Sequence, residues 1–205
     1  MAQFINKRED VVTEAIDGVL ALSGGALTRL DGYPHIRVVK RSDWDKSKVA
    51  IVSGGGSGHE PAHVGFVGKG MLTAAVCGDV FASPSVDAVL AGILAVTGPA
   101  GCLLIVKTYP GDRLNFGLAA ERARAFGLNV SMVIVGDDIA LPDLPQARGV
   151  AGTLFVHKIA GALAEQGADL DTVTKAARHV ITGTRSIGMS LDTCRVPGSP
   201  KEDRI

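Results

Sequence analysis

Aromatic side chains are scarce in this 205-residue sequence, at 4% of residues, and neither sign of charge prevails. Lysine plus arginine and aspartate plus glutamate number 21 each, so no basic surface for nucleic acid or for an anionic membrane is indicated. A surface on which bases could stack is disfavoured as well, because it needs exposed aromatic rings. We therefore expect a partner that is neither a nucleic acid nor a membrane.

Cysteines and long apolar runs are also few. No apolar run is long enough to cross a bilayer, and the first residues lack the apolar core of a signal peptide. The three cysteines, Cys77, Cys102 and Cys194, are odd in number and far apart, which is typical of reduced thiols. These features predict a cytoplasmic protein, and the length predicts one domain or slightly more.

The most distinctive stretch, residues 49–61, reads Val-Ala-Ile-Val-Ser-Gly-Gly-Gly-Ser-Gly-His-Glu-Pro. Its β-branched start predicts a buried strand, and the four glycines predict a tight loop at the carboxyl end of that strand. Ligands bind at the carboxyl ends of strands in open α/β sheets, and glycine lets backbone N–H groups approach a ligand. We expect a small polar ligand on this loop, beside His59.

The rest of the chain alternates apolar runs and amphipathic segments at βαβ spacing. This pattern predicts an α/β fold with a mainly parallel, helix-covered sheet and ligand loops at the strand carboxyl ends. Strands are expected at residues 36–40, 49–52, 71–77, 101–107, 128–135 and 186–191. Helices are expected at residues 6–22, 86–96, 114–126, 148–166 and 169–181, with a short helical turn between residues 61 and 70.

Two of these helices carry start signals. Ser83 and Pro84 resemble an N-cap and a first helical residue before the helix at 86–96. Asp169 is expected to cap the last helix.

Two nucleotide-binding motifs are nearly matched. A dinucleotide fingerprint beginning at Gly54 fails because His59 stands where its last glycine belongs. A P-loop fails twice, because Gly70 follows Lys69 and His63 takes the place of the first glycine. The sequence therefore predicts no nucleotide site in this chain.

A zinc-protease motif, H-E-x-x-H, is matched by residues 59–63. That chemistry needs both histidines on one face of a continuous helix. The glycines before His59 and the proline inside the motif, Pro61, oppose such a helix. A zinc hydrolase is the least favoured reading, and we predict no metal ligands.

A second group of polar residues, Lys107 and Asp112, follows another predicted strand. It could converge with His59 on one crevice if the two strands are neighbours. The alternatives stay open: Asp112 as a helix N-cap, and Lys107 as a solvated strand end. The pair Asp137–Asp138 could bind a metal, although a solvated turn with a cap is the commoner arrangement.

A set of motifs along the chain resembles the substrate-binding subunit or domain of the dihydroxyacetone kinases. The motifs are residues 53–61, 65–72, 81–84, 103–107, 109, 111–112, 115–116, 148–153 and 193–197. The resemblance implies phosphorylation of a terminal hydroxyl of dihydroxyacetone or a related short ketose, as in glycerol metabolism. It also implies that the substrate is held by Gly56, Ser57, Gly58, His59, Lys107 and Asp112.

Catalytic roles follow for two of these residues. Phosphoryl transfer needs a base for the attacking hydroxyl, and we favour Asp112 as that base, with His59 orienting and polarising the substrate. The reverse assignment is open. Thr108 and Pro110, where relatives often have Asn and Thr, indicate a different ketose such as erythrulose.

The resemblance also implies partners. Residues 1–195 would be the ketose-binding domain, and residues 196–205 a linker-like tail where the family continues. The donor, Mg-ATP or a tightly held ADP recharged by a phosphotransferase protein, would belong to a nucleotide-binding kinase subunit or domain. A homodimer is also implied.

One family feature has no counterpart in the sequence. The family carries a later histidine that binds the substrate covalently as a hemiaminal, and no histidine follows His179. The sequence is thus expected to be a truncated portion or a natural short form. A different class, a non-catalytic ketose sensor or regulator, is the alternative to the kinase.

Overall fold

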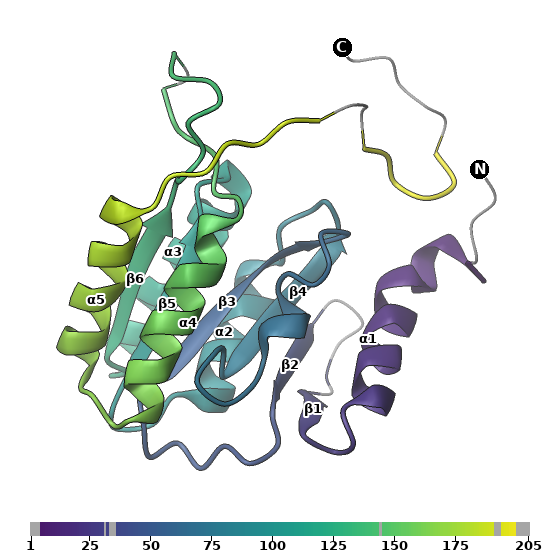
Figure 1. Ribbon diagram of the computed structural model, residues 1–205. Coiled ribbons are helices and arrows are strands. Elements are labelled where there is room, and N and C mark those ends of the chain that lie inside the picture. Colours follow the sequence, from purple (N-terminus) through teal and green to yellow (C-terminus); the bar gives the residue numbers. More distant parts are fainter. Residues whose placement is uncertain (1–4, 31, 33–35, 144, 191–193, 200–205) are drawn as a thin grey trace.

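One six-stranded sheet, in the order β1-β2-β4-β3-β5-β6, organises the protein (Figure 1). The structure, a computed structural model, describes residues 5–30, 32, 36–143, 145–190 and 194–199. Strands β4, β3, β5 and β6 are parallel, and β1 and β2 add an antiparallel edge. The predicted mainly parallel α/β sheet is confirmed. The strands are β1 (Leu27–Leu30), β2 (Arg37–Arg41), β3 (Ala50–Ser57), β4 (Ala74–Val80), β5 (Cys102–Lys107) and β6 (Val130–Val135).

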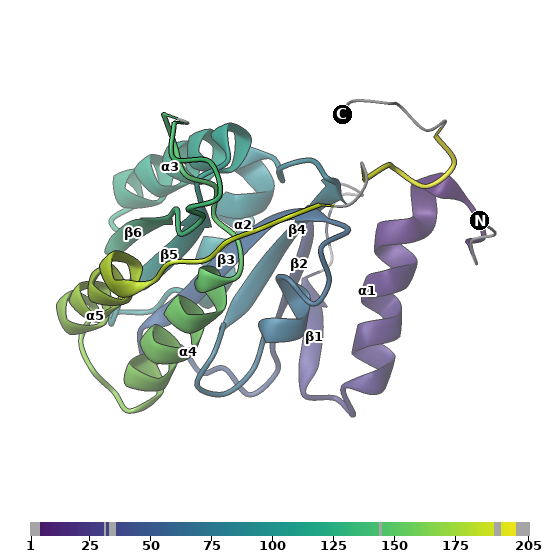
Figure 2. The same cartoon turned by 45° about the horizontal axis from the view of Figure 1, so that its top comes forward.

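Helices cover both faces of this sheet (Figure 2). Alternate strand residues point to opposite faces, so Val52 and Leu104 pack under α2 and α3 while Ile51 and Leu103 pack under α4 and α5. Helix α1 covers β2 and β4 on the α4 side. None of the helices described is long and apolar enough to cross a membrane. The helices are η1 (Arg8–Asp10), α1 (Val11–Leu22), η2 (Val64–Phe66), α2 (Val86–Val96), α3 (Pro110–Ala125), α4 (Gly152–Glu165) and α5 (Leu170–Gly183).

Strand assignments differ from the sequence prediction in three places. The glycine segment is not a loop from its start, because β3 continues through Gly54 and Gly55 to Ser57, paired with β4. Strand β1 was not predicted, because its four residues carry no alternation of apolar and polar side chains. No strand forms between residues 186 and 190; Ser186 makes one isolated bridge with Asp138, and residue 191 lies outside the described part.

The caps of two helices resolve differently. Asp169 caps α5 as predicted, and its carboxylate accepts a hydrogen bond from the Thr172 amide at 2.8 Å. Helix α2 is capped by Ser85 rather than by Ser83, and the Ser85 hydroxyl accepts from the Ala88 amide at 3.2 Å. Ser83 is thereby released for another position, beside the cavity described below.

Residues 184–190, which follow α5, run across the carboxyl ends of the strands (Figures 1 and 2). Of the predicted linker-like tail, residues 196–199 are described and residues 200–205 lie outside the described part. Thr193, within the last of the motifs compared above, also lies outside it.

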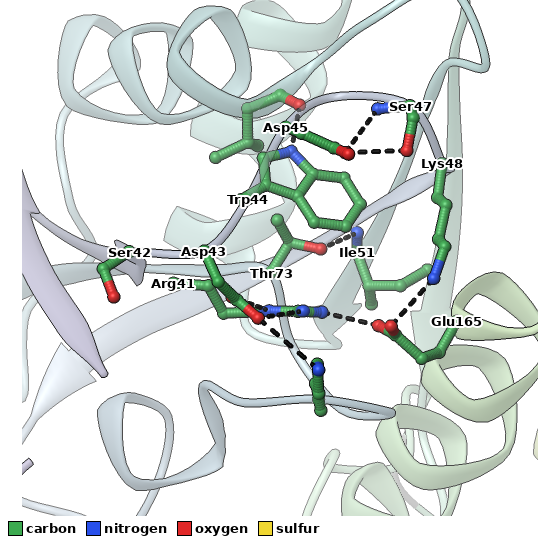
Figure 3. A network of polar contacts seen from close by, with 12 residues as sticks. Arg41, Ser42, Asp43, Trp44, Asp45, Ser47, Lys48, Ile51, Thr73 and Glu165 are labelled. Carbon is green, nitrogen blue, oxygen red and sulfur yellow. Dashed lines mark hydrogen bonds and ion pairs between the residues drawn. The ribbon is translucent and has the colours of Figure 1, made fainter.

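A network of ion pairs ties the amino-terminal edge of the parallel strands together (Figure 3). The Arg41 guanidinium, at the end of β2, donates to Glu165 at 2.6 Å and to Asp43 at 2.9 Å. Lys48 reaches the other Glu165 oxygen at 2.9 Å. The guanidinium also lies over the Trp44 ring, 5.3 Å from its centroid. The end of α4 is thus fastened to the chain before β3.

Candidate functional site

The carboxyl ends of β3 and β5 lie side by side, because the two strands are parallel neighbours. The chain leaves β3 for β4 on one side and returns through α2 to β5 on the other. Such a switch in strand order opens a crevice beyond the strand ends. The condition for convergence of the two strand ends, that the strands are neighbours, is therefore met.

A cavity of about 280 Å³, called the switch cavity, opens there. It brings four predicted site residues together: Gly56, His59, Lys107 and Asp112. Predicted residues Ser57 and Gly58 do not line it. The lining is completed by Gly55, Phe81, Ser83, Tyr109 and Gly111.

The glycines of β3 are explained first by close approach of neighbouring chain. A Cβ on Gly54 would lie 2.2 Å from the Val76 carbonyl oxygen, and one on Gly56 would lie 2.7 Å from the Ala82 nitrogen. Gly58 has φ +98°, and a Cβ there would strike the Phe81 ring at 2.7 Å. Close packing against β4 and the segment after it therefore requires glycine, and it leaves the backbone of Gly56 facing the switch cavity.

Ser57 and Gly58 face another space. The Ser57 hydroxyl donates to the Gly78 carbonyl at 2.8 Å. Both residues line a separate, largely apolar cavity of about 390 Å³ between α1 and the sheet, called the α1 cavity. Gly56 and Phe81 line both cavities, so the glycine segment forms the wall between them.

The imidazole of His59 has a defined tautomer. Its Nδ1 lies 3.0 Å from the Gly56 carbonyl oxygen, which only accepts hydrogen bonds, so Nδ1 carries the proton. The Nε2 lone pair is then free to accept a proton or a hydrogen bond. Phe81 packs edge-on against the ring, with centroids 5.3 Å apart, and orients it.

Asp112 lies in the first turn of α3 and is 5% exposed. It is not the N-cap, since Tyr109 holds that position, so the capping interpretation is wrong. Burial raises the pKa of this carboxyl, while the Ser83 hydroxyl and the charges of Lys107 and His59 lower it. Its Oδ1 has no hydrogen-bond partner among the described residues. A buried acceptor without a hydrogen-bond partner costs free energy of folding, and a donor from a ligand would recover that cost.

Lys107 ends β5 and is half-buried, so it is not the solvated strand end that was the alternative. Burial lowers the pKa of its ammonium, and the charges of Asp112 and Asp137 oppose that shift. Its Nζ lies 5.9 Å from the centroid of the Tyr109 ring, at the rim of the switch cavity.

The contribution of Phe81, Ser83 and Tyr109 was missed at the sequence level. Phe81 follows β4, and β4 lies beside β3 on the side opposite to β5. Its position at the site therefore depends on the order of the strands, which the sequence does not state. Ser83 carried an apparent capping signal that concealed its place beside Gly111. Tyr109 was noted only as part of the family resemblance.

Asp137 and Asp138 are buried and serve the backbone. The Asp137 carboxylate accepts from the amides of Val150 and Gly152 at the start of α4, at 2.9 and 2.7 Å. Asp138 pairs with Arg148. The pair is therefore structural, but it is not the solvated turn that was expected.

The zinc motif is not helical, since residues 59–63 form a turn closed by an isolated bridge between His59 and Ala62, before η2. His59 is exposed and His63 is buried, so the two rings occupy different environments. Among the residues described, no cluster of three or more His, Cys, Asp and Glu is arranged to hold a metal ion.

The switch cavity thus offers a carboxylate, an ammonium, an imidazole lone pair and a glycine backbone at one place. These groups donate and accept hydrogen bonds from several directions, as a small hydroxylated molecule requires. The two proton acceptors, Asp112 and His59, stand within the same cavity.

Comparison with known proteins identifies the family of this chain. The Dak1 domain family model matches residues 17–204. The chain is 62% identical over 195 residues to a dihydroxyacetone kinase from Citrobacter freundii, covering 95% of this chain and 35% of that protein. It is 46% identical over 200 residues to the dihydroxyacetone-binding subunit DhaK of a PTS-dependent dihydroxyacetone kinase 1 from Listeria innocua, covering 96% and 60%.

Solved structures give the same picture. The C. freundii dihydroxyacetone kinase in complex with AMP-PNP and Mg²⁺ has a TM-score of 0.95 at 60% identity, covering 98% of this chain and 38% of that one. The dihydroxyacetone kinase operon co-activator Dha-DhaQ has a TM-score of 0.76 at 37% identity, covering 81% and 51%. The chain spans about a third of the length of the C. freundii enzyme and three fifths of the Listeria subunit.

Proposed function

The chain belongs to the Dak1 domain family, and from this premise we propose that it is the ketose-binding portion of a kinase for short ketoses. The substrate would be dihydroxyacetone or a similar molecule, phosphorylated at a terminal hydroxyl. The observation that carries the proposal is the meeting of His59, Lys107 and Asp112 around one cavity, with Asp112 buried and its Oδ1 without a partner among the described residues.

Binding follows from the hydrogen-bonding capacity of the cavity. The Lys107 ammonium donates to ketose oxygens, the Asp112 carboxylate accepts from a hydroxyl, and the backbone of Gly56 lies close enough to contact the chain of the ketose. Ser57 and Gly58 face the α1 cavity, so their contribution to ketose binding is indirect. They keep the glycine segment in place, for example through the hydrogen bond from Ser57 to the Gly78 carbonyl.

Proton removal falls to Asp112 in this proposal. Burial raises the pKa of its carboxyl, which makes it a better base than a solvated aspartate, and the charge of Lys107 favours its ionised form. His59 presents its Nε2 lone pair and orients the hydroxyl that reacts. The opposite division of roles would be recognised by comparing Asp112→Asn with His59→Gln, since the base is the residue whose loss abolishes turnover while ketose binding persists.

The phosphoryl donor comes from outside this chain in the proposal. The described residues do not fit a nucleotide and its Mg²⁺: the glycine segment is strand rather than a P-loop, Lys69 is exposed, and no metal-binding cluster is present among them. A partner subunit or domain would hold Mg-ATP, or an ADP recharged by a phosphotransferase protein. We expect the protein to be a homodimer and to be located in the cytoplasm. Light scattering of the purified chain tests whether it is a dimer.

The test of binding is a titration with dihydroxyacetone, followed by nuclear magnetic resonance so that millimolar affinity is measurable. We expect Asp112→Ala to weaken binding by about 10- to 100-fold, the value of one hydrogen bond to a charged group. Asp171→Ala, an exposed aspartate on α5 paired only with Lys175 among the described residues, is the matched control. Equal affinity of all three proteins would contradict the proposal.

A sensor or regulator of the same ketose is the second candidate. It is favoured by the likeness to the operon co-activator Dha-DhaQ. The two candidates separate when a donor-carrying subunit from a relative is added with Mg-ATP. Appearance of the ketose phosphate supports the kinase, and ketose binding without any turnover supports the sensor.

A further inference from the structure

A second cleft, of about 400 Å³, borders the switch cavity and is called the inner cleft. It shares His59, Lys107 and Tyr109 with the switch cavity and extends between η2 and the first turn of α4. His63 and Thr153 lie on its wall. Lys107 therefore stands at the boundary of the two cavities.

Buried polar atoms without partners gather at this cleft. Of the seven such side-chain atoms in the described residues, four belong to His63, Thr153 and His157. His63 is 6% exposed and Thr153 is 4% exposed. His157 lies behind the wall, one helical turn from Thr153, with its ring centroid 5.5 Å from that of His63. Native proteins seldom leave such groups unpaired, so the concentration points to a ligand group.

The contacts of Ser53 decide which ring nitrogen of His63 is left without a hydrogen-bond partner among the described residues. The Ser53 hydroxyl donates its one proton to the Ile105 carbonyl at 2.6 Å. It must then accept from Nδ1 of His63, 3.3 Å away, so Nδ1 carries the proton. Nε2 is left as a bare acceptor. Burial holds the pKa of His63 well below its usual range, so this neutral form persists at neutral pH.

The cleft suits a neutral group better than an anion. The amides at the start of α4 already donate to the buried Asp137 carboxylate, which would repel a phosphate. Phe66, Leu154 and Val150 supply apolar wall against which C–H groups pack. A hydroxyl that accepts from Thr153 and donates to Nε2 of His63 would satisfy two orphaned atoms at once.

We propose that the inner cleft is a hydroxyl-binding subsite, formed by His63 and Thr153, for the end of a ketose with four or more carbons. The inference rests on the proposed function, because it assumes that the first three carbons occupy the switch cavity. The substrate class is then a tetrulose or longer ketose, for which the subsite determines specificity.

The test compares dihydroxyacetone with erythrulose, a four-carbon ketose, by magnetic resonance titration of the chain. Thr153→Val keeps the shape of the side chain and removes its hydroxyl. We expect this variant to bind erythrulose about tenfold more weakly, as for one lost hydrogen bond, and dihydroxyacetone within about twofold of the wild type. Thr174→Val is the matched control, since Thr174 on α5 is another buried threonine whose hydroxyl has no partner among the described residues and lines neither cavity.

The outcomes are separable. Dihydroxyacetone binding that Asp112→Ala weakens, with erythrulose binding insensitive to Thr153→Val, would overturn the subsite and leave the proposed function intact. A change of the His63 imidazole signal with erythrulose and not with dihydroxyacetone supports the subsite without any substitution. Absence of binding by both ketoses would contradict both proposals.

Discussion

The ion-pair network at the amino-terminal edge of the sheet and the switch cavity at its carboxyl edge differ in whether their charged groups have partners within the protein. At the amino-terminal edge, Arg41 is paired with Asp43 and Glu165, and Glu165 also holds Lys48 (Figure 3). At the carboxyl edge, the buried Asp112 keeps an oxygen without a partner in the described residues. Both regions bury charge, but the Arg41 network pairs it internally, whereas the switch cavity leaves one oxygen of Asp112 without a partner among the described residues.

The pKa shifts follow the same division. The pKa of Asp43 is lowered, chiefly by its hydrogen bond from Arg41. Burial raises the pKa of Glu165, but its hydrogen bonds from Lys48 and Arg41 outweigh burial and lower it overall. That of Asp112 is raised by burial. The amino-terminal network thus supports the fold, whereas a buried carboxylate oxygen without an internal partner is what the proposed ketose site requires.

Helix α4 connects the two regions. Its last residue, Glu165, belongs to the ion-pair network, and its first turn carries Thr153 on the wall of the inner cleft. The network therefore fixes the helix whose other end shapes the proposed binding surface.

The largest expected effect on stability comes from breaking the paired region. Arg41→Met keeps an apolar side chain of similar length but removes the guanidinium from Asp43, from Glu165 and from the Trp44 ring. We expect the free energy of unfolding to fall by about 2 kcal/mol, less than for a fully buried pair because Glu165 keeps Lys48. Urea denaturation measures it.

The control for that prediction is an exposed pair of the same kind. Arg122→Met removes the partner of Asp87, and we expect a loss below about 0.5 kcal/mol. If the two substitutions cost the same, the contrast between a stabilising network and ordinary surface charge is lost.

A smaller effect of opposite sign is expected at the site. Asp112→Asn removes a buried charge while the side chain keeps nearly the same shape. The free energy of unfolding at neutral pH should therefore stay the same or rise by up to about 1 kcal/mol. A clear loss of stability would mean that Asp112 supports the fold rather than the ligand.

The pH dependence sharpens the contrast further. Because the folded pKa of Asp112 is raised, the native state binds its proton more tightly, and the advantage of Asp112→Asn shrinks as pH falls through that pKa. Because the folded pKa of Glu165 is lowered, its contribution exists above its unfolded pKa and is lost as pH falls through the folded value. Glu165→Gln should thus be less stable than the wild type at neutral pH, and the difference should vanish once the pH has fallen below the lowered pKa of Glu165. Denaturation curves at several pH values measure both stability differences from the wild type. At neutral pH Asp112→Asn should be more stable than the wild type and Glu165→Gln less stable, and both differences should become smaller as the pH falls. Differences of the same sign at neutral pH would contradict this account.

Much of the fold followed from local sequence. Apolar periodicity predicted the five α-helices and the parallel strands, because these patterns reflect which face is buried. The missed strand β1 is short, and the glycine segment was predicted as loop because its role in pairing depends on how closely β4 approaches.

The site was predictable where it lies at strand ends and hidden where it depends on distant contacts. His59, Lys107 and Asp112 were expected to converge from the βαβ pattern. The pairing of Arg41 with Glu165 joins residues 124 positions apart, and the unpaired atoms of His63 and Thr153 are defined by burial. Neither has a local sequence signal.

The most direct test of the central proposal is a crystal structure of the chain grown or soaked with dihydroxyacetone. We predict density for the ketose in the switch cavity, within hydrogen-bond distance of Lys107 Nζ and Asp112 Oδ1. Density in the α1 cavity beside Ser57, or none at saturating concentration, would contradict the assignment of the ketose site to the carboxyl ends of β3 and β5.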